Sequence, residues 1–156
     1  MKTDVNVKRV LFYGDSLVYG KESGEDHRLD SKTRFTGVLQ DLLGDDFEIL
    51  EEGLRGGNLS GENPFFPDRD RLKQFHPILL SQLPVDLVVI FLGTNDCNAV
   101  NKDPADIAAA LHDYPPLLKK AAQFLNVTVP KILVAAPPAV NEEHFNEAMQ
   151  KVFGPG

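Results

Sequence analysis

The chain has 156 residues, of which 42% are hydrophobic and 25% charged, and its formal net charge at pH 7 is −7. This length suffices for one domain with a hydrophobic core, so we expect a single domain over residues 1–156. An acidic chain repels nucleic acid and anionic membrane surfaces, which excludes both as expected partners. No run approaches the roughly 20 apolar residues of a membrane span, and the N-terminus has no apolar stretch of signal-peptide length, which predicts a cytoplasmic protein. The single cysteine, Cys97, excludes an intrachain disulfide.

The first half of the chain alternates predicted strands and helices. Residues 9–13 form an apolar run that stops at Gly14, which predicts a buried strand. Residues 34–43 carry apolar side chains at helical spacing and predict a helix. Residues 47–50 predict a second strand. Residues 54–75 are rich in Gly, Asn, Pro, Asp and Arg, and they predict a long loop or a set of short turns. Long loops are often functional in a compact domain.

The second half of the chain continues this alternation. Residues 86–92, DLVVIFL, are apolar on both faces, as in the central strand of a parallel sheet. Pro115 and Pro116 are predicted to end or kink a helix, because neither has a backbone N–H to donate. The remaining predicted elements are helices at 78–83, 104–112, 117–125 and 142–153 and a strand at 131–135.

The alternation of strands and helices indicates the fold class. Such a pattern favours right-handed crossovers and a parallel sheet that is covered on both faces. We therefore expect an α/β fold, a flavodoxin-like three-layer α/β/α sandwich with strand order 2-1-3-4. In such sheets ligands bind beyond the carboxyl ends of the strands, where the winding reverses, which here is between the first and third strands.

Three candidate site residues follow three successive predicted strands: Ser16, Gly53 and Asn95. Ester hydrolysis needs a nucleophile, a general base and donors for the developing oxyanion. The hydroxyl of Ser16 can act as the nucleophile, and its backbone amide can donate to the oxyanion. The side-chain NH2 of Asn95 can also donate to the oxyanion. Gly53 can bring its backbone N–H close to a substrate because it has no side chain. Each motif alone is a common turn composition, so the prediction of a catalytic site depends on all three at neighbouring strand ends.

These motifs resemble those of a known family. The segments GDSL at 14–17, EEGL at 51–54 and GTND at 93–96 resemble the first three blocks of the SGNH (GDSL) hydrolases. The flanking residues resemble the arylesterase-like branch of that family, and the similarity runs over residues 9–138. The resemblance implies a serine esterase or acyltransferase that acts on short-chain or aryl carboxylic esters through an acyl-serine intermediate. It also implies that no metal or other cofactor is needed and that the partner is a small ester.

The resemblance also implies a role for each matching residue. Ser16 is the expected nucleophile. The amides of Ser16 and Gly53 and the side chain of Asn95 are the expected oxyanion hole. Asp15 and Asp96 are expected to support the site by fixing turns through hydrogen bonds to backbone amides rather than by proton chemistry.

One block of the family is missing from this sequence. The resemblance implies an Asp-x-x-His segment near the C-terminus, after a fifth strand, whose His deprotonates the serine. The nearest match, NEEH at 141–144, lacks the Asp and comes too early, so His144 is a poor candidate for the base. His76 and His112 fall in predicted helices and are expected to be surface or packing residues, and His27 is expected to be solvated in a loop.

Two explanations of the missing block remain open: a chain truncated at its C-terminus, which we favour, or a natural short protein that lacks the base. Either explanation predicts weak hydrolysis or none. An alternative function is therefore a catalytically inactive flavodoxin-like module that binds a small ester or anion at the same strand ends. A sheet that ends at its fourth strand leaves an edge exposed, which would favour a homo-oligomer.

The remaining candidates carry weaker predictions. Arg55 is expected to be an exposed loop arginine, although it could meet a substrate. Cys97 is expected to be a small buried thiol without a redox role. No spacing of His, Cys and Asp resembles a metal site. The substrate pocket is expected to be lined by loops 17–33, 54–75 and 97–103.

Overall fold

The computed structural model describes residues 7–97, 103–139 and 141–153. Its elements are β1 Lys8–Gly14, α1 Ser16–Tyr19, α2 Phe35–Leu43, η1 Gly44–Asp46, β2 Phe47–Gly53, α3 Arg71–Gln82, β3 Leu87–Phe91, η2 Asn95–Cys97, α4 Pro104–Ala110, η3 Leu111–Asp113, α5 Tyr114–Leu125, β4 Lys131–Val134, η4 Glu142–His144 and α6 Glu147–Phe153. Within these ranges no helix is both long and apolar enough to cross a lipid bilayer.

The four strands form one parallel sheet in the order β2-β1-β3-β4, which confirms the predicted fold class and strand order. At the carboxyl end of β1, Gly14 lies opposite Gly53 of β2 on one side and opposite Phe91 of β3 on the other. This register places the ends of the three strands at one edge of the sheet, and the segments that follow them begin side by side.

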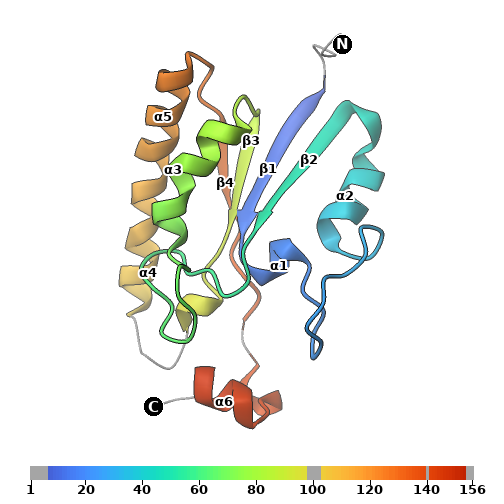
Figure 1. Ribbon diagram of the computed structural model, residues 1–156, viewed down its shortest axis with the longest axis vertical. Helices are drawn as coiled ribbons and strands as arrows, with labels where there is room; N and C mark the ends of the chain where they lie inside the picture. The colour runs from blue at the N-terminus through green and yellow to red at the C-terminus, as the bar shows by residue number, and fades with distance from the viewer. Residues whose placement is uncertain (1–6, 98–102, 140, 154–156) are drawn as a thin grey trace.

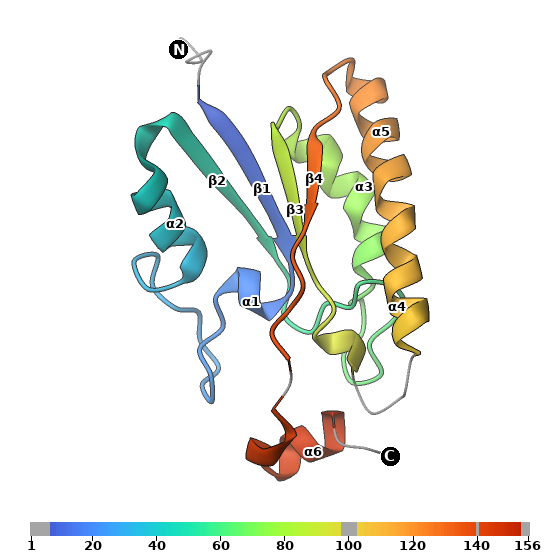
Figure 2. The ribbon, with the colours of Figure 1, turned by 180° about the vertical axis from the view of Figure 1, so that it is seen from behind.

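Helices cover the sheet on both faces. Figure 1 and Figure 2 show α1 and α2 on one face and α3 and α5 on the other, with α6 beyond the carboxyl ends of the strands. Alternate side chains of β1 point to opposite faces of the sheet, because successive side chains of a strand point in opposite directions. The ring of Tyr13 packs at 4.9 Å from that of Phe75 on α3, whereas the ring of Phe12 packs at 5.5 Å from that of Phe35 on α2.

Helix α3 is longer than the sequence predicts. We expected a loop to residue 75 and a short helix from 78, but α3 begins at Arg71. The carboxylate of Asp70 caps it by accepting hydrogen bonds from the amides of Leu72 and Lys73. Phe75 and Leu79 are fully buried, so packing against the sheet holds the first half of the helix in place despite its polar composition and internal proline.

The predicted break before Pro115 and Pro116 is confirmed, but the next helix begins at Tyr114 rather than at 117. Helix α4 ends at Ala110 and is followed by η3, and the two prolines stand at the beginning of α5, directly after Tyr114. The first amides of a helix have no partner within the helix, so a residue without an N–H loses nothing there. The helix that precedes them ends through the single turn η3.

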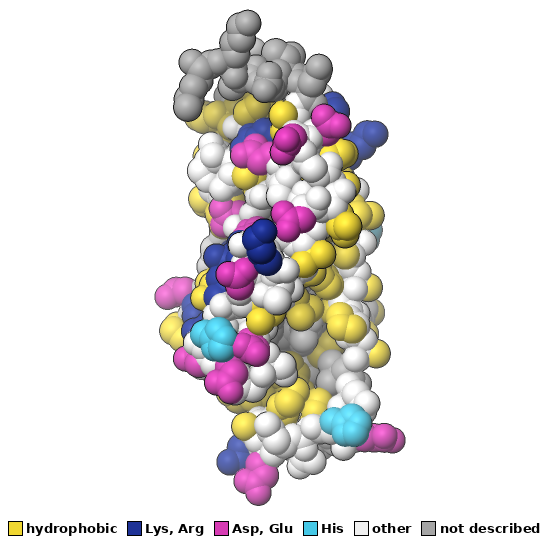
Figure 3. Space-filling model, turned by 90° about the vertical axis from the view of Figure 1, so that its right-hand side faces the viewer, with side chains coloured by type: hydrophobic (Ala, Val, Ile, Leu, Met, Phe, Trp, Pro, Cys, Tyr) yellow, Lys and Arg dark blue, Asp and Glu magenta, His cyan; other side chains and the backbone are white. Residues whose placement is uncertain are grey.

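Strand β4 lies at the edge of the sheet, as predicted, and its outer side chains are poorly covered. Leu133 and Val134 are 53% and 47% exposed, which is unusual in a parallel sheet. On α2, Val38 and Leu42 are also exposed, and Figure 3 shows apolar side chains among the charged ones on the α2 side of the molecule.

Candidate active site

Ser16 is the first residue of α1 and directly follows the turn at the end of β1. It is half-buried, and the carboxylate of Asp15 caps the helix that it begins. The turn needs glycine at position 14, because a Cβ there would lie 2.3 Å from Cγ2 of Val18 and 2.6 Å from the carbonyl oxygen of Phe91. Gly14 therefore lets α1 fold back tightly against the sheet and fixes the position of Ser16.

Asn95 lies in η2, just after β3, and its side chain joins the two neighbouring segments. Its Nδ2 donates to Oδ2 of Asp15 at 3.2 Å and to the carbonyl oxygen of Gly57 at 3.0 Å. The structure thus brings Asn95 next to the residue that precedes Ser16. It also attaches the segment after β2 to the same place.

Gly53 ends β2 and contacts α1. A Cβ at this position would lie 2.1 Å from the amide nitrogen of Tyr19 and 2.6 Å from its Cα. The absence of a side chain therefore allows β2 to approach the α1 backbone, a packing role that the sequence analysis did not foresee. The next residue, Leu54, donates to the carbonyl of Gly14 at 3.1 Å, so the N–H of Gly53 points away from β1.

The loop after β2 is held by buried polar contacts that the sequence analysis missed. Oδ2 of Asp96 accepts a hydrogen bond from the amide of Leu59 at 2.7 Å, a contact between residues 37 apart rather than within a local turn. The guanidinium of Arg71 is buried over the ring of Tyr13 at 3.9 Å and donates to the carbonyl of Glu52 at 2.7 Å. A pair of glycines followed by Asn58, inside an otherwise polar loop, was the available signal for such close packing.

The comparisons with known proteins agree with this geometry. The sequence pattern of the GDSL-like Lipase/Acylhydrolase family matches residues 12–153, a range that contains Ser16, Gly53 and Asn95. The chain belongs to this family. It is therefore an ester hydrolase of the GDSL type.

Solved structures of two esterases resemble this GDSL-like hydrolase over most of its length. The native aryl esterase of M. smegmatis is 35% identical, with a TM-score of 0.85 over 96% of this chain and 73% of that one. Est24, a carbohydrate acetylesterase from Sinorhizobium meliloti, is 33% identical, with a TM-score of 0.86 over 96% of this chain and 72% of that one. No sequence among the curated proteins matches the chain.

The carboxyl group of Asp15 is fully buried in this GDSL-like hydrolase. Burial raises its pKa from 3.8 to about 6; the amide of Leu17 opposes this shift, and the charge of Asp96 adds to it. The folded protein thus binds the Asp15 proton more tightly than the unfolded chain does. Ionisation of Asp15 therefore costs stability as the pH rises from about 4 to about 6.

A pH series of urea unfolding checks this consequence. We expect wild type to lose about 2–3 kcal/mol of unfolding free energy, relative to Asp15→Asn, between pH 4 and pH 7. The comparison with Asp15→Asn removes the contribution of the titrating groups that do not interact with Asp15. An equal pH dependence of the two proteins would contradict the shift.

None of the described histidines contacts Ser16 as a general base would. His27 is exposed and its Nε2 pairs with Oε2 of Glu22 at 2.5 Å, while His112 and His144 are also exposed. His76 lies on α3 with a buried Nε2, as expected of a packing residue. Within the described ranges, none of the four hydrogen-bonds to Ser16.

Two weaker predictions can be compared with the structure. Arg55 forms an ion pair with Asp26 and lies 5.7 Å from the centroid of the Tyr19 ring. The prediction of a buried thiol was wrong: Cys97 is exposed, and its Sγ donates to the carbonyl of Gly93 at 3.4 Å. The reason is that β3 has already ended there, so η2 lies outside the sheet.

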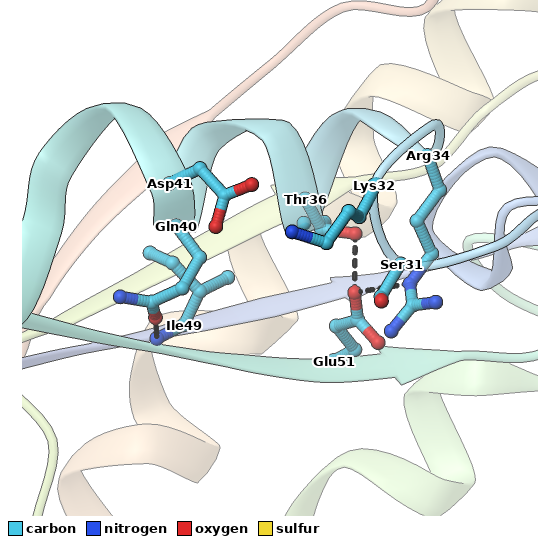
Figure 4. Close-up of a pocket in the computed structure, with 9 residues that line it drawn as sticks. Ser31, Lys32, Arg34, Thr36, Gln40, Asp41, Ile49 and Glu51 are labelled. Atoms are coloured by element: carbon cyan, nitrogen blue, oxygen red, sulfur yellow. Dashed lines mark hydrogen bonds and ion pairs between the residues drawn. The ribbon is translucent and has the colours of Figure 1, made fainter.

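A cavity of about 280 Å³ lies between α2 and β2 (Figure 4), and neither Ser16 nor Asn95 lines it. It is lined by Ser31, Lys32, Arg34, Thr36, Gly37, Gln40, Asp41, Ile49 and Glu51. Glu51 is held there by hydrogen bonds from Arg34, at 2.7 Å, and from Thr36. Burial alone would raise the pKa of Glu51, but these two hydrogen bonds lower it, which marks a structural ion-pair cluster.

Only part of the predicted substrate pocket can be compared. The cavity touches loop 17–33 through Ser31 and Lys32 alone and includes no residue of loop 54–75. Most of the third predicted loop, 97–103, lies outside the described residues.

Proposed function

We propose that the chain is a serine esterase that acts on short-chain or aryl carboxylic esters through an acyl intermediate on Ser16. The observation that carries this proposal is the hydrogen bond from Asn95 to Asp15, because it joins a side-chain donor after β3 to the turn that presents Ser16. A nucleophile and an oxyanion donor at neighbouring strand ends are the parts that acyl transfer requires.

The oxyanion hole would combine a side chain with backbone amides. The sequence predicts the amides of Ser16 and Gly53 and the side chain of Asn95 as donors, but the N–H of Gly53 points away from β1 and would have to turn to join the other two. The turn at 54–57 offers another candidate, since Asn95 donates to Gly57 and the neighbouring Gly56 has a φ of 74°. Among the described residues, no acceptor bonds the amide of Gly56, which leaves it available to an anion.

The reaction would proceed in two steps. Oγ of Ser16 attacks the ester carbonyl, its proton passes to a base, and the tetrahedral oxyanion accepts hydrogen bonds from the hole. The alcohol then leaves, and water hydrolyses the acyl-serine by the same route. No described histidine bonds Ser16, so the absence of the Asp-x-x-His block stays a prediction. Without a base to take the proton of Ser16, we expect the reaction to be slow.

The proposed substrate class rests on size and on the relatives. One similar structure is named an aryl esterase and another a carbohydrate acetylesterase, so both names point to small acyl or alcohol groups. The predicted pocket loops are modest, which favours short acyl chains over long ones.

A series of p-nitrophenyl esters tests this substrate class. We expect kcat/KM to fall by roughly tenfold from acetate to octanoate, because a small pocket excludes the longer chain. The hydrolysis by Ser16→Ala is subtracted as the background for each ester. A rate that grows with acyl length would overturn the proposal for short esters.

A further inference from the structure

The buried carboxylate of Asp15 has two separate contacts. Oδ1 accepts a hydrogen bond from the amide of Leu17 at 2.9 Å, and Oδ2 accepts one from Nδ2 of Asn95 at 3.2 Å. The first contact caps α1, and a single acceptor atom, such as a serine hydroxyl, suffices for a cap. The second contact joins residues 80 apart in the chain and is not needed for capping.

The amide group of Asn95 is thereby held from two sides. An asparagine side chain has two N–H donors, and here one meets the Asp15 carboxylate and the other the Gly57 carbonyl. Two acceptors on different segments fix the plane of the amide. The bond to an ionised carboxylate is the stronger of the two, so an incoming oxyanion would compete with the neutral carbonyl of Gly57.

The groups around Asp15 make its charge state sensitive. Its carboxyl group is fully buried, with Asp96 of η2 raising its pKa and Arg71 of α3 lowering it, and both of these side chains are also buried. An ionised Asp15 offers only acceptors to Asn95, whereas the protonated form has one oxygen that donates. The hydrogen bond from Asn95 to Asp15 therefore depends on the ionisation of the Asp15 carboxyl group, whose pKa is about 6.

We propose that Asp15 is a positioning residue that holds the side-chain amide of Asn95 in the orientation needed to stabilise the oxyanion formed at Ser16. This inference rests on the proposed function, in which Ser16 attacks the ester. It assigns Asp15 a role beyond the helix cap. The carboxylate in the turn after β1 holds the side-chain amide of Asn95, which follows β3, at a fixed place relative to Ser16.

Two substitutions separate this role from capping. Asp15→Ser and Asp15→Asn both keep an acceptor for the amide of Leu17, but neither offers Asn95 a carboxylate. We expect each to lower kcat for p-nitrophenyl acetate by about 10- to 100-fold and to change KM by less than about twofold. If Asp15 only caps the helix, both variants will keep the wild-type kcat, and Asp15→Ala alone will lose activity.

The side-chain NH2 signal of Asn95 in a ¹H–¹⁵N spectrum gives a readout that needs no turnover. We expect it to shift with a midpoint near pH 6 in wild type and to stay fixed in Asp15→Asn. The positioning role is overturned if the signal is the same in both proteins, or if both variants keep kcat while Ser16→Ala loses it. Wild-type rates in Ser16→Ala would instead refute the proposed function, and the NH2 signal would still report on the contact.

Discussion

Replacing Ser16 by alanine is expected to lower the hydrolysis of p-nitrophenyl acetate by about tenfold. The loss is modest because the serine and its base act as a unit, so a site without its base gains little from the covalent route, while the oxyanion donors and binding still accelerate attack by water. The rates of purified wild type and variant, measured at equal concentration, check this result. Ser81→Ala is the matched control, because that hydroxyl is exposed on α3 and, within the described part of the chain, bonds only the carbonyl of Ile78.

The same assay tests the predicted lack of a base. Wild type is expected to be slow, and added imidazole should raise its rate above the background of Ser16→Ala with the same imidazole present, because an external base can replace a missing one. Rapid hydrolysis that requires Ser16 and whose rate does not change with added imidazole would contradict this prediction. It would show that a base already acts on the serine.

Replacing Gly53 by alanine is expected to lower the free energy of unfolding by about 3 kcal/mol. The new Cβ would lie 2.1 Å from the amide nitrogen of Tyr19, and backbone atoms cannot move aside as the end of a side chain can. Urea denaturation of variant and wild type measures the difference. Relaxation would have to separate β2 from α1, which should also disturb the turn at Ser16.

Gly24→Ala provides the control for this substitution. Gly24 has a φ of 82°, but its Cβ would meet nothing within 4 Å, so only the backbone strain of about 1 kcal/mol is expected. Equal stability of the Gly53→Ala protein and wild type would show that Gly53 is not required for packing.

The sheet could be predicted from the sequence because its strands are local and strongly apolar. The segment 86–92 is apolar on both faces and became the inner strand β3, and the run at 9–13 became β1. The strand order followed from the alternation with helices. The predicted ends of the strands were less exact. The second strand was predicted over 47–50, but β2 extends to Gly53, because its pairing with β1 continues through the polar residues that follow Leu50.

The errors arose where tertiary contacts outweigh local signals. The polar composition of residues 54–75 predicted a loop up to residue 75, yet Asp70 caps α3 and the buried side chains of Phe75 and Leu79 hold it. The helix predicted from 117 begins at Tyr114, so Pro115 and Pro116 lie in its first turn rather than before it. A proline has opposite effects at the first turn and in the interior of a helix.

The candidate site was predictable as a set of positions but not as a set of contacts. The motifs placed Ser16, Gly53 and Asn95 at strand ends, and the register of the sheet puts those ends together. Which group meets Asn95 depends on side-chain packing between distant segments. The contacts to Asp15 and Gly57 therefore appear only in the structure.

The most direct test of the account is to identify the residue that becomes acylated. Wild type is incubated with a fluorophosphonate probe or with p-nitrophenyl acetate, quenched in acid, digested and analysed by mass spectrometry, with Ser16→Ala in parallel. We predict an adduct on the peptide that contains Ser16 and no adduct in the variant. An adduct on another residue, or equal labelling of the two proteins, would contradict the assignment of Ser16 as the nucleophile.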